Sequence, residues 1–450
     1  MTPWRAEIRR VGALALPVIG ATVGTMFMGV VDTAMVGRVS VEALAGASLG
    51  GVWIFGTFLL AQGVLMGMDP LVSQAHGAGD GRACGLALQR AVVTALLLSV
   101  PLGGSWLLAG DFLALTGQDP ALVAEAHRYV AVQVPSVPFL MVFVALRQYL
   151  QGRELMRPSM WVVLVANLFN AALAWALIFG HLGLPALGLL GAGIATAVTR
   201  VLMLAMLLAL VLGLELHAGA WTPWSRAAFD RRGLAHILRL GVPVALQVAF
   251  EVWAFSGSTL IAGRLGAVAL GAHTVTLNLA AFAFMFPLGI SQGAATRVGN
   301  LLGAGRTADA QRASWVCMAM GGGVMAISAM LFVVFRRALP RIYTGEADVL
   351  TLSAAILPIA AAFAIFDGTQ VVACGVLRGM GDTRPAARYN LLGYWVLGLP
   401  LGGWLALRGG LGLAGIWWGL ALGLAVVALL LVRRVRVRGP ASLALRPVAP

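Results

Sequence analysis

Three acidic residues, Asp32, Glu251 and Asp367, lie well inside long apolar stretches, whereas the other acidic residues fall in polar segments or near the ends of apolar ones. A charge at the centre of a bilayer costs at least about 2.5 kcal/mol, so an ionisable residue at that depth is a candidate for function. Neighbouring carboxyl groups in a dehydrated site can bind a proton, a sodium ion or an organic cation, and can exchange one for another. The residues therefore predict ion-coupled binding of a cation.

The composition places these acids in a membrane protein. Of the 450 residues, 60% are apolar and only 11% are charged, whereas soluble domains contain about 25% charged residues. A mean hydropathy of +0.91 also excludes a disordered chain. All 31 basic residues are arginines and the net charge is +14. In a membrane protein this excess is typical of cytoplasmic loops rather than of nucleic-acid binding, so no nucleic-acid partner is expected.

Apolar stretches long enough to cross a hydrocarbon core of about 30 Å recur twelve times. The chain is therefore expected to be an all-α integral membrane protein. Loops on one side of the twelve spans hold 23 of the arginines. The positive-inside rule then puts both termini in the cytoplasm. The expected spans are 13–36, 43–68, 86–109, 126–150, 160–180, 187–213, 238–263, 268–294, 312–335, 350–376, 389–407 and 411–432.

An internal repeat relates the two halves of the chain. A shift of 226 residues aligns Pro17 with Pro243 and the segment 77–79 with 303–305. Each copy contains six spans, so both copies enter the membrane in the same direction and form a parallel repeat. The expected organisation is a six-helix bundle at 1–213, a cytoplasmic linker at 214–237, a second bundle at 238–432 and a basic cytoplasmic tail at 433–450.

Two of the three acids are expected to lie at the same depth in the membrane. Glu251 lies about 18 Å along a helix from Arg239, and Asp367 lies about 16 Å from Arg378. Both are therefore expected near the midplane of the second bundle, while Asp32 belongs to the outer half of the first. The repeat does not duplicate the acids, which favours a distinct role for each. Their aligned residues are Ser258 for Asp32, Thr25 for Glu251 and Leu140 for Asp367.

Several motifs resemble the multidrug and toxic compound extrusion (MATE) transporters, and the setting of Glu251 and Asp367 resembles the NorM-type branch. The resemblance covers essentially all twelve spans. It implies a V-shaped pair of six-helix bundles that exports organic cations such as dyes and drugs in exchange for H⁺ or Na⁺ by alternating access. The motifs are MGVVDTAMVGR (28–38), PLVSQAHGAGD (70–80), FEVWAFSGSTLIAGRLG (250–266), ATRVGNLLGAGR (295–306) and FDGTQVVACGVLRGMGDTRP (366–385).

The resemblance assigns ion-coupling and substrate-binding roles to Asp32, Glu251 and Asp367, and it matches Asn170 to a polar residue of the fifth helix. The chain departs from the family pattern at Ala174, where many relatives have Asn or Asp, and at Phe363, where some sodium-coupled relatives have Tyr. Both departures remove an oxygen ligand, and Na⁺ needs several. Proton coupling is therefore favoured over Na⁺ bound at Glu251 and Asp367, and no cofactor is expected.

Further residues of the predicted helices could line a polar or aromatic cavity. Amide side chains can instead bond neighbouring helices, and aromatic residues at helical spacing are more often packing residues. The candidates are Asn170, Gln247, Asn278, Gln292 and Gln370 among the amides, with Phe250, Trp253, Phe282, Phe286 and Phe363 as possible cation–π faces.

Two other functions remain open at this point. A lipid-linked precursor flippase would need a cationic cavity, whereas the embedded residues are mainly acidic. A prenyl transferase, which is an enzyme, would need clustered Asp residues to hold Mg²⁺. The sequence also has no GxxxxGK[ST] phosphate loop, which argues against an ATP-driven pump. We therefore expect a non-enzymatic, monomeric secondary transporter in contact with membrane lipid.

Overall fold

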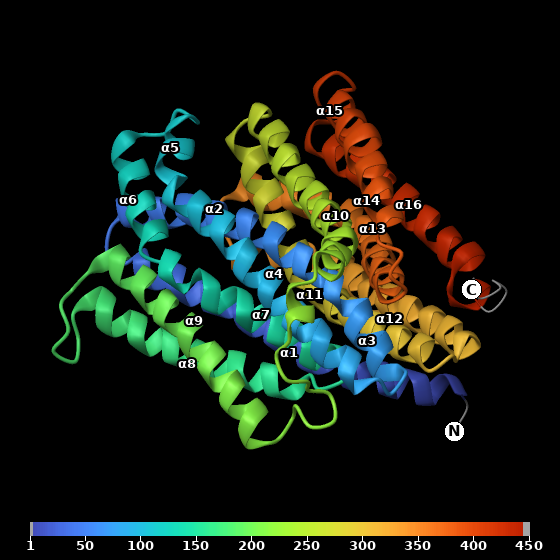
Figure 1. Ribbon diagram of the computed structural model, residues 1–450. Coiled ribbons are helices and arrows are strands. Elements are labelled where there is room, and N and C mark those ends of the chain that lie inside the picture. Colours follow the sequence, from blue (N-terminus) through green and yellow to red (C-terminus); the bar gives the residue numbers. More distant parts are fainter. Residues whose placement is uncertain (1–2, 444–450) are drawn as a thin grey trace. The chain divides into compact units, whose positions relative to one another are not determined.

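The computed structural model describes residues 3–443, and every regular element in that range is a helix (Figure 1). Short 3₁₀ turns connect several of them. The helices of the first half are α1 (Pro3–Val36), α2 (Val41–Leu65), α3 (Asp69–Gly77), α4 (Gly81–Leu107), α5 (Ala109–Ala114), α6 (Pro120–Ala131), α7 (Val137–Gly152), α8 (Arg157–Phe179) and α9 (Gly188–Gly213). Those of the second half are α10 (Arg231–Arg264), α11 (Ala267–Gly303), α12 (Thr307–Val334), α13 (Ala347–Gly379), α14 (Arg384–Asn390), α15 (Leu399–Leu407) and α16 (Gly412–Arg438).

Twelve of the described segments are long and apolar enough to cross a membrane, which confirms the predicted fold class and span count. Three spans are interrupted helices. A 3₁₀ turn at Met66–Met68 joins α2 to α3, and another at Val134–Ser136 joins α6 to α7. In the eleventh span a π-helical segment, Leu391–Gly398, joins α14 to α15. Such breaks free backbone groups, so they occur inside membranes where protein surrounds them.

Local sequence signals explain where the helices begin and end. Ser40 accepts a hydrogen bond from the backbone N–H of Ala43, at 3.0 Å, and so caps α2. Asp80 caps α4 in the same way, at 2.8 Å from the N–H of Ala83. Gly180 ends α8 with a φ of 77°, a conformation that glycine adopts without a steric penalty. These caps satisfy groups that the helix itself leaves unpaired.

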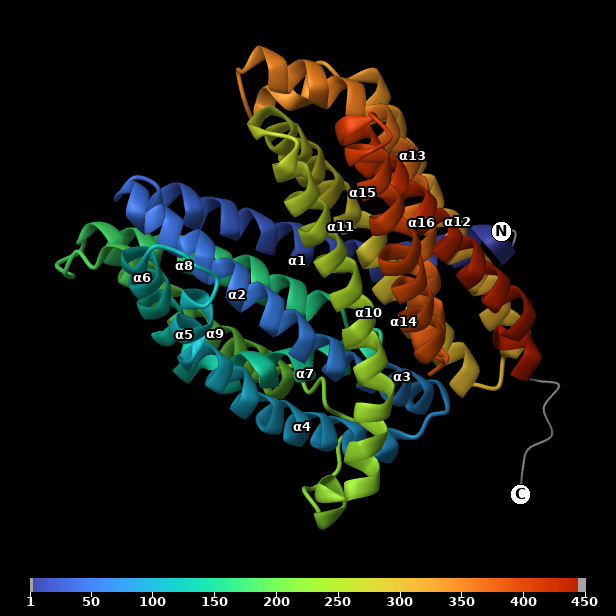
Figure 2. The same cartoon turned by 90° about the horizontal axis from the view of Figure 1, so that it is seen from above.

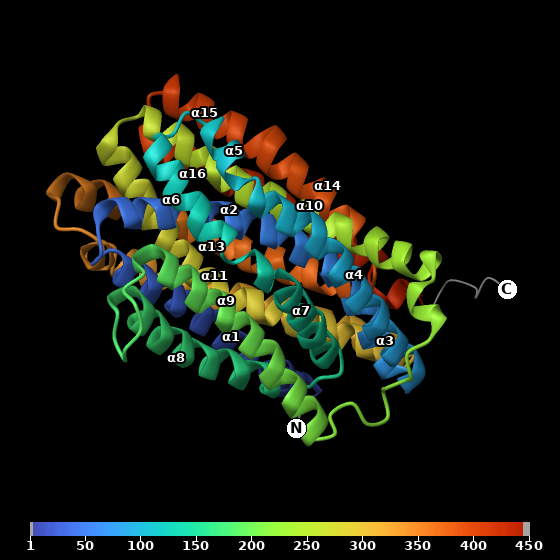
Figure 3. The same cartoon turned by 60° about the vertical axis from the view of Figure 1, so that its left-hand side comes forward.

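Contacts divide the chain into two compact units, which are described separately. The N-terminal unit contains Gly20–His76 and Asp80–Gly241, and the C-terminal unit contains the residues up to Ile19, Gly77–Gly79 and those from Val242 onward. Within the N-terminal unit α8 packs along α9 (Figure 3). Within the C-terminal unit α15 packs along α16 (Figure 2). The start of α1 therefore belongs with the second repeat, and the start of α10 belongs with the first.

The expected ends of the first bundle at 213, of the linker at 237 and of the second bundle at 432 were inferred from the repeat, and they remain predictions. In the structure, α10 begins at Arg231 and α16 continues to Arg438, so parts of the expected linker and tail are helical. The rest of the linker is held to the N-terminal unit: the Tyr149 hydroxyl donates to the Ala220 carbonyl at 2.7 Å, and Gln89 donates to the Thr222 carbonyl at 2.7 Å. Residues 444–450 of the expected tail, including Arg446, lie outside the described residues.

A row of glycines on α16, the glycine seam, lies where the last two spans of the C-terminal unit pack together. Gly415, Gly419 and Gly423 are spaced four residues apart on α16, so they lie on one helix face. A Cβ on Gly415 would lie 2.6 Å from the Ala406 backbone nitrogen, and one on Gly419 would lie 2.6 Å from the Gly398 carbonyl oxygen. Small residues of this kind allow helix backbones to approach closely in lipid. The seam therefore fixes the eleventh span against α16.

Candidate ion- and substrate-binding sites

The first predicted acid belongs to a polar network within the N-terminal unit. The amide of Asn170, on α8, donates to both carboxylate oxygens of Asp32, on α1, at 3.0 and 3.2 Å. The hydroxyl of Thr199, on α9, donates to the Asn170 carbonyl oxygen at 3.2 Å. Asn170 is fully buried and Asp32 is half-buried. Asn170 therefore orients the carboxylate and is itself oriented by Thr199.

Ala174, one turn after Asn170, contributes no polar group to this network. Its side chain is buried in an apolar cluster with Val36 and Ile178. The position at which the family pattern offers a further oxygen is thus a packing position in this chain. The network around Asp32 contains one carboxylate, one amide and one hydroxyl.

The other two predicted acids come together within the C-terminal unit. Glu251 on α10 is 8% exposed and Asp367 on α13 is 5% exposed, and the two carboxyl groups are close enough to interact electrostatically. Gln370, one turn after Asp367, is a hydrogen-bonding neighbour of Glu251. The structure thus brings together two acids that are far apart in the sequence, as their shared depth suggested.

The eleventh span adds two polar residues to this site that the sequence analysis did not single out. Asn390 is fully buried; its carbonyl oxygen accepts from the Gln370 amide at 3.2 Å, and its own amide points to the Gln247 carbonyl at 3.5 Å. Tyr394, one turn later in the π-helical segment, is also fully buried and lies within electrostatic range of both acids. The signal in the sequence is two polar residues four positions apart in an apolar span, and neither carries a charge that would be costly in lipid.

Three oxygen atoms at this site are sealed from the surface without a hydrogen-bond partner in the described chain. They are Asp367 Oδ1, Gln370 Oε1 and the Tyr394 hydroxyl. A buried unsatisfied polar atom is costly, so each one calls for an explanation such as a bound ion, an ordered water or a functional role. The described residues contain no cluster of three or more His, Cys, Asp and Glu side chains of the kind that holds a divalent metal. The oxygens of this site fit a proton, a monovalent cation or the charged group of an organic cation.

Phe363 lies one turn before Asp367 and is buried among aromatic rings. Its ring centroid is 5.9 Å from that of Phe255 and 5.8 Å from that of Trp417, both edge to face. Phe255 also contacts the Tyr394 ring, at 6.0 Å. The aromatic cluster contributes no oxygen except the Tyr394 hydroxyl, which lies within electrostatic range of both acids.

The remaining predicted residues lie in different environments. Gln247 and Gln292 are buried and Phe250 and Phe286 are half-buried. Trp253, Asn278 and Phe282 are exposed on the protein surface. Asn278 bonds its own helix through the Thr274 carbonyl at 3.0 Å, and Phe282 packs edge to face on Phe286 with centroids 6.0 Å apart. Their role in lining a cavity stays a prediction.

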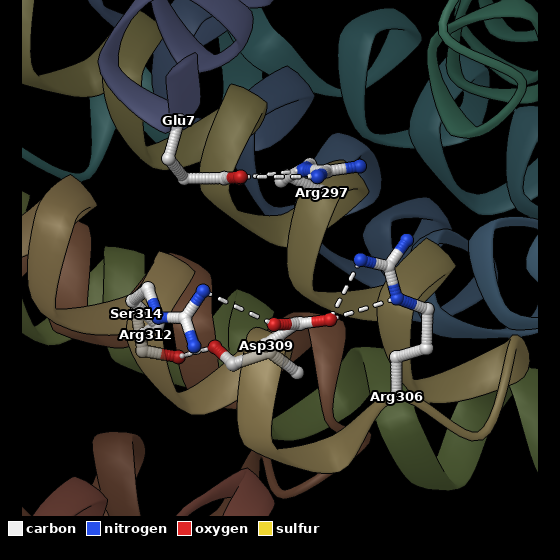
Figure 4. A network of polar contacts seen from close by, with 7 residues as sticks. Glu7, Arg297, Arg306, Asp309, Arg312 and Ser314 are labelled. Carbon is white, nitrogen blue, oxygen red and sulfur yellow. Dashed lines mark hydrogen bonds and ion pairs between the residues drawn. The ribbon is translucent and has the colours of Figure 1, made fainter. Parts of the chain in front are cut away.

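A separate set of ion pairs lies at the predicted cytoplasmic end of the C-terminal unit (Figure 4). Arg297 on α11 forms two hydrogen bonds with the Glu7 carboxylate on α1, at 2.6 and 3.1 Å. Asp309 pairs with Arg306 at 2.6 Å and with Arg312 at 3.3 Å. Only the Glu7–Arg297 pair is substantially buried, with side chains 13% and 10% exposed. It anchors the start of α1 to the unit that contains the acid pair.

The sealed Tyr394 hydroxyl leads to a prediction. Tyr394→Phe removes a buried polar atom that has no partner, so we expect the free energy of unfolding to stay the same or to rise by about 1 kcal/mol. If the hydroxyl acts on the bound ion or substrate, transport by the same variant should fall. The measurement is thermal unfolding in detergent together with dye export by reconstituted protein. Lower stability with unchanged export would indicate a purely structural hydroxyl.

The geometry agrees with comparisons to known proteins. The sequence profile of the MatE family matches residues 17–176 and 243–404, one match in each repeat. The probable multidrug resistance protein NorM of Bradyrhizobium diazoefficiens is 35% identical, covering 94% of this chain and 92% of that protein. The multidrug resistance protein NorM of Aliivibrio fischeri is 32% identical, covering 97% of this chain and 95% of that protein.

Solved structures show the same fold. A eukaryotic MATE transporter superposes with a TM-score of 0.89 at 24% sequence identity, covering 98% of each chain. An outward-facing multidrug resistance transporter of the MATE family superposes with a TM-score of 0.87 at 18% identity, covering 98% of this chain and 97% of the other. The profile and the relatives exclude the alternative of a prenyl transferase, because the proteins they describe are transporters and not enzymes. With a profile match in each repeat and NorM relatives along nearly its full length, the chain belongs to the MatE family of membrane transporters.

Proposed function

We propose that the chain is a secondary antiporter that exports small organic cations from the cytoplasm in exchange for protons. The observation that carries the proposal is the buried pair of Glu251 and Asp367, with the sealed oxygens of Gln370 and Tyr394 beside it. Two buried carboxyl groups within electrostatic range of each other resist carrying two negative charges, so they hold a proton or another cation. Protonation from outside then releases the organic cation, and deprotonation inside allows the next one to bind.

Proton coupling is favoured over sodium coupling by the ligands available. Ala174 and Phe363 are buried apolar side chains, so neither acid network gains an oxygen at these positions. Na⁺ is a hard cation that needs several oxygen ligands, whereas a proton needs one carboxyl group. The asymmetry of the repeat supports separate roles: Glu251 and Asp367 couple the proton to export, and Asp32 with Asn170 forms a second cation site in the N-terminal unit.

The relatives support export of drugs as the physiological direction, since they are named multidrug resistance proteins. Their name gives no support to a lipid-linked precursor flippase. The arginine asymmetry supports cytoplasmic termini. The bacterial source of the relatives supports a bacterial inner membrane as the location. Solved relatives with this fold include an outward-facing form, which supports alternating access.

The proposal is tested by ethidium export from proteoliposomes under an imposed pH gradient and, separately, an imposed sodium gradient. We expect export to follow the pH gradient and to collapse when a protonophore dissipates it. A sodium gradient at fixed pH should leave export at the level of protein-free vesicles. Export driven by sodium alone would contradict proton coupling, and the absence of export under either gradient would contradict the antiporter itself.

A further inference from the structure

The linker loop, residues 214–230 between α9 and α10, exposes three large aromatic side chains although it lies outside the twelve spans. Trp221, Trp224 and Phe229 are 46%, 51% and 62% exposed. Along a span such side chains are covered by lipid tails, but in a polar loop exposed apolar groups indicate an interaction surface. The proposed exchange of cations for protons makes no use of them, so the surroundings of the loop decide what covers them.

The backbone of the linker loop is packed against one face of α4. Gly81, Gly85 and Gln89 are spaced four residues apart, so they lie on the same face of that helix. A Cβ on Gly81 would lie 1.8 Å from the Gly219 carbonyl oxygen, and one on Gly85 would lie 2.7 Å from the Thr222 backbone nitrogen. The Gln89 amide donates to the Thr222 carbonyl at 2.7 Å. The loop is therefore a fixed part of the N-terminal unit and not a flexible tether.

The contacts of the linker loop place it at the level of the membrane surface. Gln89 lies eight residues, or about 12 Å, into the helix of the third span. Tyr149, which bonds the neighbouring Ala220 carbonyl, lies three residues before the end of the fourth span. Trp221 and Trp224 flank the residues that these two side chains hold, so they lie beside the ends of two spans. Tryptophan is enriched at this level, where the hydrocarbon core meets the headgroups.

The charge around these aromatic residues is positive and is not neutralised within the chain. The stretch 220–239 contains one acid, Asp230. Its carboxylate accepts from the backbone N–H of Gly233 at 2.9 Å and pairs with Arg90 at 3.5 Å, so it is occupied within the fold. Three arginines of the same stretch are exposed and form no ion pair in the part of the chain that the structure describes: Arg226, Arg231 and Arg232. The surface therefore combines exposed aromatic rings with free guanidinium groups.

We propose that the linker loop and the first turn of α10 form a binding surface for anionic phospholipids of the cytoplasmic leaflet. Basic residues next to the cytoplasmic end of a span attract anionic lipid, and a guanidinium can form two parallel hydrogen bonds with a phosphate. Trp221 and Trp224 favour a lipid over a soluble phosphate compound, because a soluble compound has no apolar part to cover them. The inference is independent of what the protein transports.

The test compares two phospholipids with the same acyl chains: phosphatidylglycerol, which is anionic, and phosphatidylcholine, which has no net charge. Binding of each lipid to the purified full-length protein is measured by native mass spectrometry, which separates the lipid-free protein from its lipid complexes. The wild-type protein should bind phosphatidylglycerol more tightly. The double variant Arg226→Gln/Arg231→Gln should weaken its binding by about 25-fold, at about fivefold for each arginine, and leave phosphatidylcholine unchanged. The single variant Arg226→Gln should lose about fivefold, and it decides the matter if the double variant does not fold.

Arg336→Gln/Arg337→Gln is the matched control, because it removes the same charge from two exposed arginines that follow the ninth span, on the predicted opposite side of the membrane. It should leave the binding of both lipids unchanged. Trp221→Ala should weaken both lipids by the same factor, because it removes an apolar contact and no charge. Equal affinity of the wild-type protein for the two lipids, or equal losses in the two arginine double variants, would overturn the inference. Displacement of phosphatidylglycerol by glycerol 3-phosphate would also overturn it, since the site would then bind a soluble phosphate and not a lipid.

Discussion

Asp367→Asn is expected to abolish proton-driven export while leaving the protein folded and inserted. Asparagine has nearly the same volume as aspartate, so the packing of this buried position should be preserved. The amide cannot exchange a proton, however, so the proton gradient loses its coupling to the bound cation. Export should fall by about 100-fold, towards the upper end of usual coupling energies between linked ligands. The measurement is the initial rate of ethidium export in proteoliposomes under a pH gradient.

Asp348→Asn provides the matched control, because Asp348 is an exposed acid in the first turn of the same helix, α13. This variant should export at the wild-type rate. Folding of both variants is compared by size-exclusion chromatography in detergent. If Asp367→Asn retained full export with an intact pH response, Asp367 would be a structural acid and the coupling site would lie elsewhere.

The second large effect concerns the glycine seam of the last two spans. Gly419→Leu inserts a branched side chain where a Cβ alone would already lie 2.6 Å from the Gly398 carbonyl oxygen and closer still to the Gly402 backbone. The clash is with backbone, which cannot rotate away as a flexible side chain can. We expect destabilisation of about 3 kcal/mol, the upper end of typical overpacking costs, with a loss of folded protein. Thermal unfolding in detergent and the yield of monodisperse protein measure this effect.

Gly323→Leu is the control for this substitution. Gly323 also lies within a long helix, α12, but a Cβ there would meet no atom within 4 Å. Its replacement should be nearly neutral, or slightly stabilising because glycine is a poor helix former. Equal losses for both variants would show that leucine at any helical glycine is harmful, and would remove the special role of the seam.

The seam also bears on the candidate site. Gly393 and Gly398 flank Tyr394 in the π-helical segment, and Gly393 packs against the backbone of Gly423. Displacing the eleventh span from α16 would therefore move Tyr394 and Asn390 away from Glu251 and Asp367. In Gly423→Ala the added Cβ would lie 2.2 Å from the Gly393 carbonyl oxygen, so this variant should displace the segment that holds Tyr394 and lower the rate of ethidium export.

Much of the architecture could be predicted from the sequence because the membrane imposes simple constraints. A span needs about 20 apolar residues, so counting apolar stretches recovered all twelve spans of the structure. The parallel repeat was visible because glycines and prolines at tight turns and packing points recur at a fixed shift. The boundaries were less accurate. Helices such as α3 and the start of α10 extend beyond the apolar core into segments whose polarity suggested loops.

The candidate site was predicted in part, for a similar reason. Asp32, Glu251 and Asp367 stand out because a buried charge is expensive in lipid, and the pairing of the last two followed from their depth. Tyr394 and Asn390 could not be identified from the free-energy cost of placing them in lipid, because a hydroxyl or an amide is tolerated in many membrane helices. Only their position on the interrupted eleventh span, facing Gln370 and the acids, identifies them.

The sequence by itself determined the class of protein, the number of spans, the repeat and the three embedded acids, because each follows from composition or from the cost of placing a charge in lipid. The tertiary structure decided which polar side chains meet. It joined Asp32 to Asn170 and Thr199, and it brought residues of the eleventh span to the acid pair. Such neighbours depend on helix rotation and on breaks such as the π-helical segment, which are set by packing among several helices and leave no periodic signal in a single one.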